Sequence, residues 1–460
     1  MRCPVSLRRL FPVVLLLGVP LLTAARAGLA AVPHLAFKRS EPADRGRLNV
    51  SPRRVSLWFT ATPQLAFSRI TLSGAGGAIT LDTIVADTGH ALHAAIPREL
   101  PDGDYRVVWQ TASADGHTIR GEFSFTVLAS RPDTHAHVDS VPPARIDARD
   151  THRDQPASHG ELRSARWVEF VALITILGAL GFRHGVLPPL ASRGVPTGDA
   201  ADRARRLGQG GVFLYLLAAA LRLHATSTAV NGDARALAPD ALGALLTGTS
   251  WGMGWTTGMV GALLLLTGWG LSRRRSPIGT PIALTGALGL VASPALTGHA
   301  ASSNWFIAAV TLDMLHVLAA GVWIGGLLMV VLAGIPAMRA LTDGNADAAV
   351  SALVSSFHPM ALLCAPVVVV AGVGTSVLRL GAAAPLTTTR YGVILLLKVA
   401  IFLLLMGIAT YNSLRARRQL GTPRGTAHLR RTASVELLLA ALVLAATAAL
   451  VATPAPILTQ

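Results

Sequence analysis

The pattern of apolar and polar positions divides this chain of 460 residues into two parts. Between residues 34 and 128 apolar and polar positions alternate with a period of two, which is typical of half-buried strands. Arg53–Thr60 (RRVSLWFT) and Asp104–Thr111 (DYRVVWQT) are examples, and glycine-rich turns such as Gly74–Gly77 separate them. About seven short strands in roughly 95 residues predict a small antiparallel sandwich, an all-β fold of the Ig-like or cupredoxin-like kind.

After residue 166 the alternation is replaced by long apolar blocks. Each block is close to the ~20 residues that a helix needs to cross the apolar part of a bilayer. The blocks predict an all-α bundle of eight transmembrane helices within residues 167–460. They lie at about 167–187, 207–227, 251–271, 277–297, 305–333, 357–380, 391–411 and 434–452.

The N-terminus has the features of a signal peptide, which we assign to residues 1–30. Three arginines precede an apolar core that is too short for a good membrane span, and small residues suited to cleavage follow it. Residues 31–128 then form the sandwich domain, and residues 129–166 form a polar linker without periodicity. Once the signal peptide is removed, Cys364 is the remaining cysteine, which excludes a disulfide framework and a cysteine-based zinc site.

The formal charge of +16 comes almost entirely from arginine. The arginines crowd every second loop between the apolar blocks instead of forming a basic face, which argues against a nucleic-acid partner. The positive-inside rule makes these loops cytoplasmic and puts the sandwich and the C-terminus outside, in agreement with the signal peptide. We therefore expect a multi-pass protein of a bacterial cytoplasmic membrane, with its sandwich on the periplasmic or extracellular side.

Ionisable side chains inside apolar blocks are costly to bury and usually functional. Asp313 and His316 of the fifth block are three residues apart and share one helix face. His299 lies at the outer end of the fourth block, and Met314 adds a thioether next to Asp313. This donor set suits copper better than magnesium or calcium, which prefer oxygen. A purely structural role for Asp313 and His316, as hydrogen-bond partners of neighbouring helices, stays open.

Two further groups belong to the inner half and the late spans. Near the inner side, His184 ends the first block and His358 opens the sixth, and each is either an interfacial residue or part of an exit site. Glu436 and Lys398, in or near the last blocks, are expected to pair with other helices and hold the bundle together.

The sandwich contains one segment that its own pattern does not explain. In Thr111–Phe125 (TASADGHTIRGEFSF), a turn accounts for Asp115 and Gly116, since both residue types favour turns. A turn does not account for the imidazole of His117.

These residues carry a resemblance to two copper families. Residues 34–127 resemble the CopC copper-binding domain through HLAFKRSEPADRGRL, SPRRVSLWFT and PDGDYRVVWQTASADGHTIRGEFSF. The membrane half is similar to CopD through SPALTGHAASS, TLDMLHVLAAGVWIGGL and TTTRYGVILLLKVAIFLLL. The resemblance implies a CopC–CopD fusion that handles copper at a bacterial envelope.

The resemblance also implies a Cu(II) site in the sandwich. Its ligands are His34, through the terminal amine and the imidazole, together with Asp115 and His117. If the signal is cleaved after Ala30 or Ala31, His34 is not terminal and loses its amine as a ligand. His90 or His93 then remain open as contributors, although an exposed strand edge is the simpler interpretation of both.

Three functions follow as alternatives. The leading one is copper import or copper tolerance, in which the sandwich captures Cu(II) and the bundle passes copper inward. Its partners are copper ions, the lipid bilayer and other periplasmic copper proteins. The second is a haem-binding electron-transfer protein with His299 and His316 as candidate axial ligands. The third is a periplasmic copper buffer or sensor that moves no copper. None of the three is an enzyme.

Overall fold

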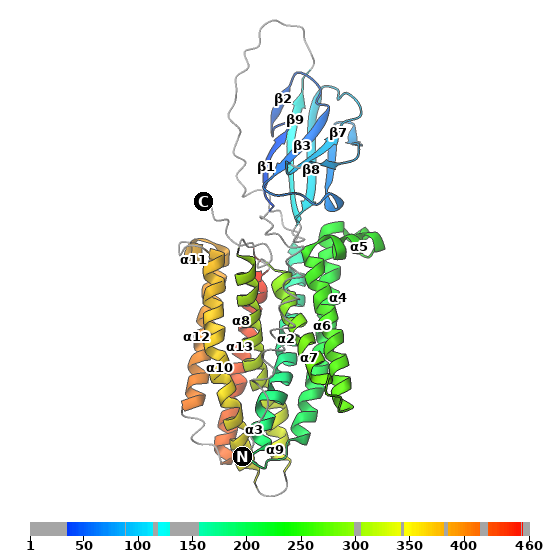
Figure 1. The fold of residues 1–460 in the computed structure, drawn as a ribbon. Coiled ribbons are helices and arrows are strands. Elements are labelled where there is room, and N and C mark those ends of the chain that lie inside the picture. The colour runs from blue at the N-terminus through cyan, green and yellow to red at the C-terminus, as the bar shows by residue number, and fades with distance from the viewer. Residues whose placement is uncertain are drawn as a thin grey trace. The chain divides into compact units, whose positions relative to one another are not determined.

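The computed structural model describes residues 35–87, 89–113, 118–128, 156–298, 305–341, 345–380, 385–414, 422–451 and 453. They form two compact units, which Figure 1 colours along the chain. One unit holds the sandwich together with His224–Met253, and the other holds the helices from His159–Leu223 and from Gly254 onward. The predicted signal peptide lies outside the described residues, as does most of the predicted linker.

The sandwich is an all-β domain of two sheets, as the alternating pattern predicts. The four-stranded sheet has the order β1-β3-β7-β6 and the five-stranded sheet the order β2-β9-β8-β4-β5. Strand neighbours are antiparallel, except that β2 runs parallel to β9. The strands are β1 (Phe37–Glu41), β2 (Gly46–Leu48), β3 (Arg54–Phe59), β4 (Arg69–Gly74), β5 (Gly77–Ile79), β6 (Val85–Ala86), β7 (Ala91–Ala95), β8 (Gly103–Ala112) and β9 (Thr118–Val127), with a 3-10 turn η1 (Leu65–Phe67) after β3. The described residues form nine strands, against about seven predicted. Strands β2, β5 and β6 have two or three residues each, which are too few to display a period of two.

An aromatic cluster forms the core at one end of the sandwich. The ring of Trp109 on β8 stacks on Phe37 with the ring centroids 5.1 Å apart, and Phe59 packs against it edge-on at 5.5 Å. Gly121 of β9 lies opposite Trp109, and a Cβ atom there would come within 2.5 Å of the indole. Glycine at position 121 therefore makes room for the tryptophan that anchors β8.

Each apolar block of the sequence lies on a helix of the second part of the chain. Two long helices contain a π-helical turn and resume as short helices with a proline in their first turn. These are α2 (Pro156–Gly181), η2 (Phe182–Val186) and α3 (Leu187–Ala191), then α8 (Phe306–Met329), η5 (Val330–Gly334) and α9 (Ile335–Arg339). The remaining helices are α4 (Gly198–Asn231), η3 (Asp233–Arg235), α5 (Pro239–Gly248), α6 (Ser250–Arg273), α7 (Gly279–Leu296), α10 (Ala346–Leu380), α11 (Pro385–Thr388), α12 (Arg390–Leu414) and α13 (Pro423–Val451).

The number of membrane-spanning segments differs by one from the prediction. Within the described residues, seven helical segments are long and apolar enough to cross a membrane, against the eight expected. The predicted block 251–271 does form a helix, α6, of 24 residues. Its stretch Trp251–Gly258 (WGMGWTTG) is rich in glycine and threonine, which lowers its apolar character.

The start of the first long helix also differs. Helix α2 begins at Pro156, inside the segment predicted as linker. Polar residues such as Glu161 and Arg163 can continue a helix beyond its apolar part, so apolar length marks the membrane core and not the helix end.

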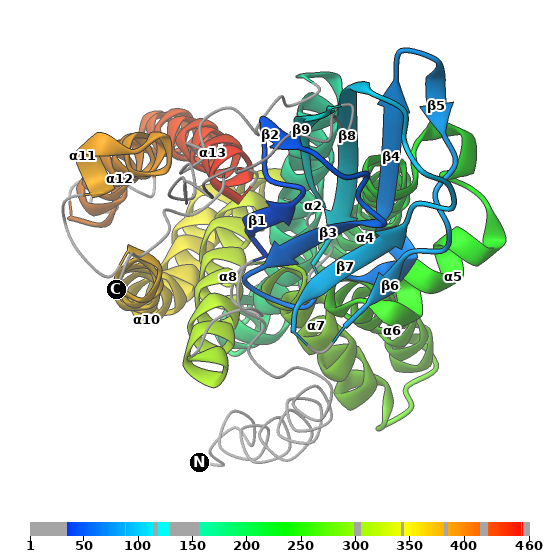
Figure 2. The same ribbon diagram turned by 90° about the horizontal axis from the view of Figure 1, so that it is seen from above.

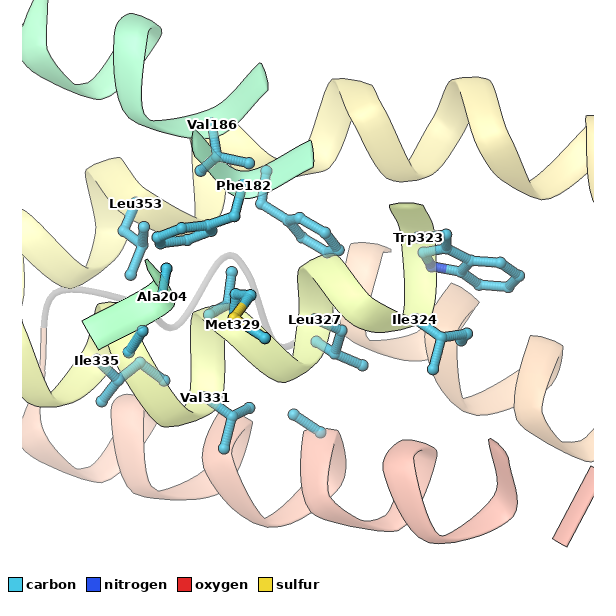
Figure 3. Packing of buried hydrophobic residues seen from close by; sticks show 14 of the residues in the cluster. Phe182, Val186, Ala204, Trp323, Ile324, Leu327, Met329, Val331, Ile335 and Leu353 are labelled. Carbon is cyan, nitrogen blue, oxygen red and sulfur yellow. The ribbon is translucent and has the colours of Figure 1, made fainter. Parts of the chain in front are cut away.

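Helices α2 and α8 lie in the middle of the helical unit. Figure 2 shows α10, α12 and α13 on one side of them and α6 and α7 on the other. Glycines allow α2 and α8 to touch, since a Cβ atom on Gly178 would lie 2.2 Å from the backbone of Gly325. Figure 3 shows the apolar packing around η5, where Phe182 and Met329 are fully buried.

Candidate metal centres

The predicted ligands of the sandwich, His34, Asp115 and His117, lie outside the described residues. The strands that lead to them are described. Strands β8 and β9 pair in register along their whole length, and the last pair is Ala112 with Thr118. Asp115 and His117 thus belong to the segment that joins these two strands.

The chain leading to His34 and the end of β8 lie at the same end of the sandwich. The amide of Thr60 donates to the carbonyl of Ala36 at 2.9 Å, and the amide of Gln64 donates to the carbonyl of Ala112 at 2.9 Å. One short segment, residues 60–64, therefore contacts both stretches that carry the predicted ligands. The fold brings together parts of the chain that are far apart in the sequence.

His90 lies at this same end. Its carbonyl accepts a hydrogen bond from the amide of Phe59 at 3.0 Å, and its Nδ1 lies 2.8 Å from the hydroxyl of Thr62. Its backbone φ of 60° falls in the left-handed region that side chains other than glycine rarely adopt. The imidazole is thus held through one nitrogen beside the segment 60–64.

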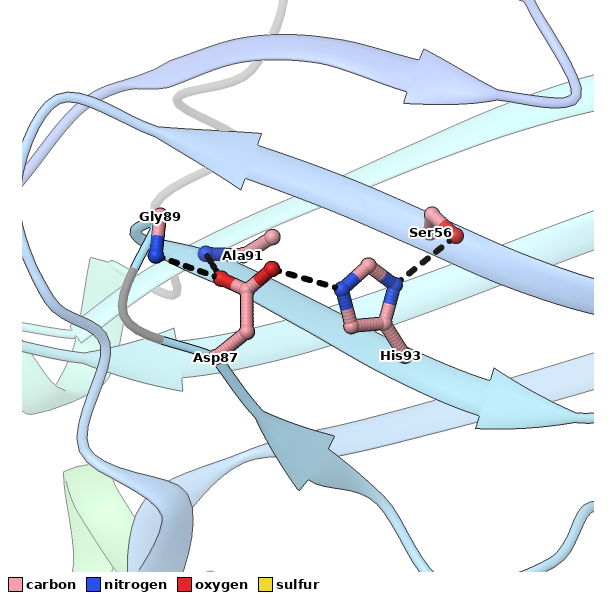
Figure 4. Close-up of polar contacts among 5 residues, drawn as sticks. All are labelled: Ser56, Asp87, Gly89, Ala91 and His93. Atoms are coloured by element: carbon pink, nitrogen blue, oxygen red, sulfur yellow. Dashed lines mark hydrogen bonds and ion pairs between the residues drawn. The ribbon is translucent and has the colours of Figure 1, made fainter.

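His93 has a different environment, shown in Figure 4. Its Nδ1 is 2.9 Å from the hydroxyl of Ser56, and its Nε2 is 3.1 Å from a carboxylate oxygen of Asp87. The hydrogen bond from His93, with a second from the amide of Ala91, lowers the pKa of Asp87 below its ordinary value. Because both ring nitrogens have protein partners, His93 is a structural residue. It is not at an exposed strand edge as expected from the sequence, since β7 pairs with β3 on one side and β6 on the other.

In the helical unit, Asp313 and His316 both face α10. The Nδ1 of His316 lies 3.0 Å from the carbonyl oxygen of Val368, and the hydroxyl of Thr375 donates to Asp313 Oδ1 at 3.2 Å. A Cβ atom on Gly372 would lie 3.1 Å from the His316 ring, so this glycine lets the imidazole pack closely against α10. A neutral histidine that donates from Nδ1 to a carbonyl carries its lone pair on Nε2, as metal-binding histidines commonly do.

The third member of this predicted set, His299, lies outside the described residues. Within the ranges that the structure covers, no three His, Cys, Asp or Glu side chains gather closely enough to hold a metal ion. The pairing of His299 with His316 as haem ligands stays a prediction for the same reason. Of the predicted membrane set, the described chain thus brings together Asp313 and His316.

A buried ion pair was missed by the sequence analysis. Arg222 of α4, 1% exposed, pairs with Glu169 of α2, 0% exposed, and its Nη2 also donates to the hydroxyl of Thr297 at 3.1 Å. Arg166 is buried within electrostatic reach of both. The rule that identified Asp313, an ionisable residue inside an apolar block, applies equally to Glu169 and Arg222 and would have found them. Two arginines and one glutamate give this cluster a net positive charge.

A cavity of about 270 Å³ lies between α8, η5, α10, α12 and α13. Its walls are mainly aliphatic and aromatic, but His358, Asn412, Ser413 and Glu436 also line it. Glu436 accepts a hydrogen bond from the amide of Asn412, which confirms the expectation that it pairs with another helix.

Comparisons with known proteins agree with this architecture. Residues 37–128 match the family model of the CopC domain, residues 162–306 that of the Copper resistance protein D-like N-terminal domain, and residues 351–450 that of Copper resistance protein D. Copper transport protein CutJ from Bacillus subtilis (strain 168) is 24% identical over 434 residues, which are 92% of this chain and 74% of CutJ.

Two solved structures are similar to the sandwich. CopC from Methylosinus trichosporium OB3b is 25% identical, and the match covers 22% of this chain and 100% of that protein with a TM-score of 0.20. PcoC, a methionine-rich copper resistance protein from Escherichia coli, is 25% identical over 21% of this chain and 99% of PcoC, also with a TM-score of 0.20. The three matched regions follow one another along the chain, which is therefore a CopC–CopD fusion: a CopC domain joined to the membrane region of a copper resistance protein D.

Proposed function

We propose that this protein captures Cu(II) outside the bacterial cytoplasmic membrane and passes copper inward through its helical bundle. The observation that carries the proposal is the hydrogen bonding of His316 and its position next to Asp313. Its Nδ1 donates to the carbonyl of Val368, the hydrogen bond that orients many metal-binding histidines and puts the ring lone pair on Nε2. Asp313, one turn away on the same face, supplies a negative charge suited to a cation. The name of CutJ, a copper transport protein, supports copper as the cargo.

Capture outside the membrane is supported by the geometry of the sandwich. The segment 60–64 contacts both the chain next to His34 and the end of β8, so the two halves of the predicted ligand set start from one end of the domain. His90 is held at that end and offers its Nε2. It would complete the site if the mature chain begins before His34 and the terminal amine is lost.

Copper movement into sealed vesicles tests the function. Proteoliposomes with the purified full chain should accumulate radioactive copper at least tenfold faster than protein-free liposomes. A single stoichiometric binding phase without accumulation would instead favour a copper buffer. A Soret absorption band in the purified protein would favour the haem-binding alternative.

The topology gives a second prediction. Helix α6 has 24 residues, about 36 Å at 1.5 Å per residue, which exceeds the ~30 Å apolar thickness of a bilayer. It ends at Arg273, followed by two further arginines that suit a cytoplasmic loop. We expect eight crossings, so a periplasmic alkaline phosphatase fused after Gln460 should be active. An inactive phosphatase, with a cytoplasmic reporter active at the same position, would mean that α6 does not cross.

A further inference from the structure

The cavity between α8, α10, α12 and α13 lies next to the predicted outer site. Val368, whose carbonyl holds His316, is three residues from Ala365, which lines the cavity. Three residues of helix advance about 4.5 Å. The contact that holds His316 is therefore about one helical turn of α10 from the cavity wall.

The cavity has a polar end. The Nδ1 of His358 lies 3.4 Å from the hydroxyl of Ser413, and the neighbouring Asn412 donates to the carboxylate of Glu436. Asn412 is 8% exposed and Glu436 4%. The Oδ1 of Asn412 has no hydrogen-bond partner among the described residues. A buried oxygen without a donor is costly, and a bound cation or its water would satisfy it.

The thioether of Met406 also lines the cavity, on the side of Ser413 that faces the outer half of the bundle. Met406, Thr410 and Ser413 on α12 all line the cavity, and their spacing of four and three residues places them on one helix face. Met406 is about 10 Å from Ser413 along the helix axis at 1.5 Å per residue. Soft sulfur and imidazole donors suit copper, and oxygen donors complete its coordination.

Irregular helices account for the open space. Pro359 and Pro366 lie inside α10, and each removes a backbone hydrogen bond and displaces the preceding turn. On the facing helix, the π-helical turn η5 supplies Val330 and Val331 to the cavity wall. Two such helices cannot interlock regularly, and π-helical turns occur frequently at functional sites.

The buried ionisable groups differ in net charge between the two sides of the bundle. The buried cluster on α2 and α4 has two arginines, Arg166 and Arg222, for one glutamate, and it repels a cation. At the cavity, the carboxylate of Glu436 is held by a neutral amide. A copper ion is therefore favoured on the side of α10, α12 and α13.

From these contacts we propose that the cavity is an inner copper-binding site, in which His358 and Glu436 ligate copper, the Asn412 amide oxygen assists, and Met406 receives the ion from the outer half. The proposal rests on the proposed function, since it takes copper as the cargo of the bundle. It assigns the inner part of the route to described residues that no family resemblance named.

The test compares copper bound by the full chain in detergent. The variant Met406→Leu keeps the side-chain volume, and His358→Gln keeps hydrogen-bonding capacity to Ser413. We expect the double variant to bind one equivalent fewer of Cu(I), supplied with ascorbate and measured by metal analysis after dialysis. In proteoliposomes its uptake should fall at least tenfold. Matched controls are Met329→Leu, a buried methionine that does not line the cavity, and His428→Gln, a half-buried histidine beside Tyr411 that does not line it either.

The outcomes separate the two proposals. If the parent protein moves no copper but the double variant still loses one equivalent, the inner site stands and the transport function fails. If the parent protein moves copper and the folded double variant keeps every equivalent and full uptake, the inner site is wrong. Should the double variant not reach the membrane, Met406→Leu alone decides, because a volume-conserving change in an apolar wall is tolerated. Unchanged uptake and unchanged Cu(I) affinity in Met406→Leu would then overturn the inner site.

Discussion

Replacing His316 by glutamine should reduce copper uptake at least tenfold while the protein still folds and inserts. The side-chain amide of glutamine can donate to the carbonyl of Val368 as His316 Nδ1 does, so the contact between α8 and α10 is kept. An amide is a poor copper ligand, so the metal-binding nitrogen is lost. A tenfold loss corresponds to about 1.4 kcal/mol. Uptake by proteoliposomes, normalised to the amount of protein, measures the effect.

The control for His316→Gln is His428→Gln, which removes a half-buried imidazole beside Tyr411 from α13 and should leave uptake unchanged. If His316→Gln transports copper at the parent rate, His316 serves packing alone. Loss of the variant from the membrane would support the structural interpretation, in which Asp313 and His316 join α8 to α10.

In the isolated sandwich, residues 34–128, the substitution His117→Ala should weaken Cu(II) binding at least tenfold, again about 1.4 kcal/mol. The domain has its own apolar core around Trp109 and Phe59, so we expect it to fold alone. Removing one of the few ligands that the CopC resemblance implies takes away a full metal–nitrogen bond. Competition with a chromophoric Cu(II) chelator gives the affinity.

His93→Ala is the matched control, because both nitrogens of His93 already have protein partners in Ser56 and Asp87. It should leave the Cu(II) affinity unchanged. His90→Ala in the full chain, after processing in cells, distinguishes the two possible mature ends, since it should weaken Cu(II) binding when the chain starts before His34 and have little effect when His34 is terminal. Equal affinity in parent and His117→Ala domains would remove His117 from the site.

Much of the architecture could be predicted from residue patterns. A period of two predicts strands wherever a sheet has one buried face, and this located β3, β8 and β9. Apolar length located a helix at every predicted block, because backbone groups in a bilayer must bond within their own segment. One of the eight predicted spans, α6, has the length of a transmembrane helix but a less apolar composition than the seven that meet both criteria.

For the sites, the sequence determined which residues share a helix face and which apolar blocks carry ionisable groups. The pair Asp313 and His316 follows from a spacing of three residues alone. Their partners Val368, Thr375 and Gly372 are more than 50 residues away, and only the packing of α8 on α10 decided them.

The same distinction applies to the histidines of the sandwich. His90 and His93 are equivalent in a sequence pattern, but β7 turns His93 toward Ser56 and Asp87 while His90 meets Thr62 at the end that carries the predicted copper ligands. The cavity at Glu436 depends likewise on four helices meeting around two prolines and a π-helical turn. The spacing of residues in the sequence determines the direction in which a side chain points from its own helix or strand. The residue that it contacts depends on which helices and strands pack together, and tertiary contacts between residues distant in the chain decide that packing.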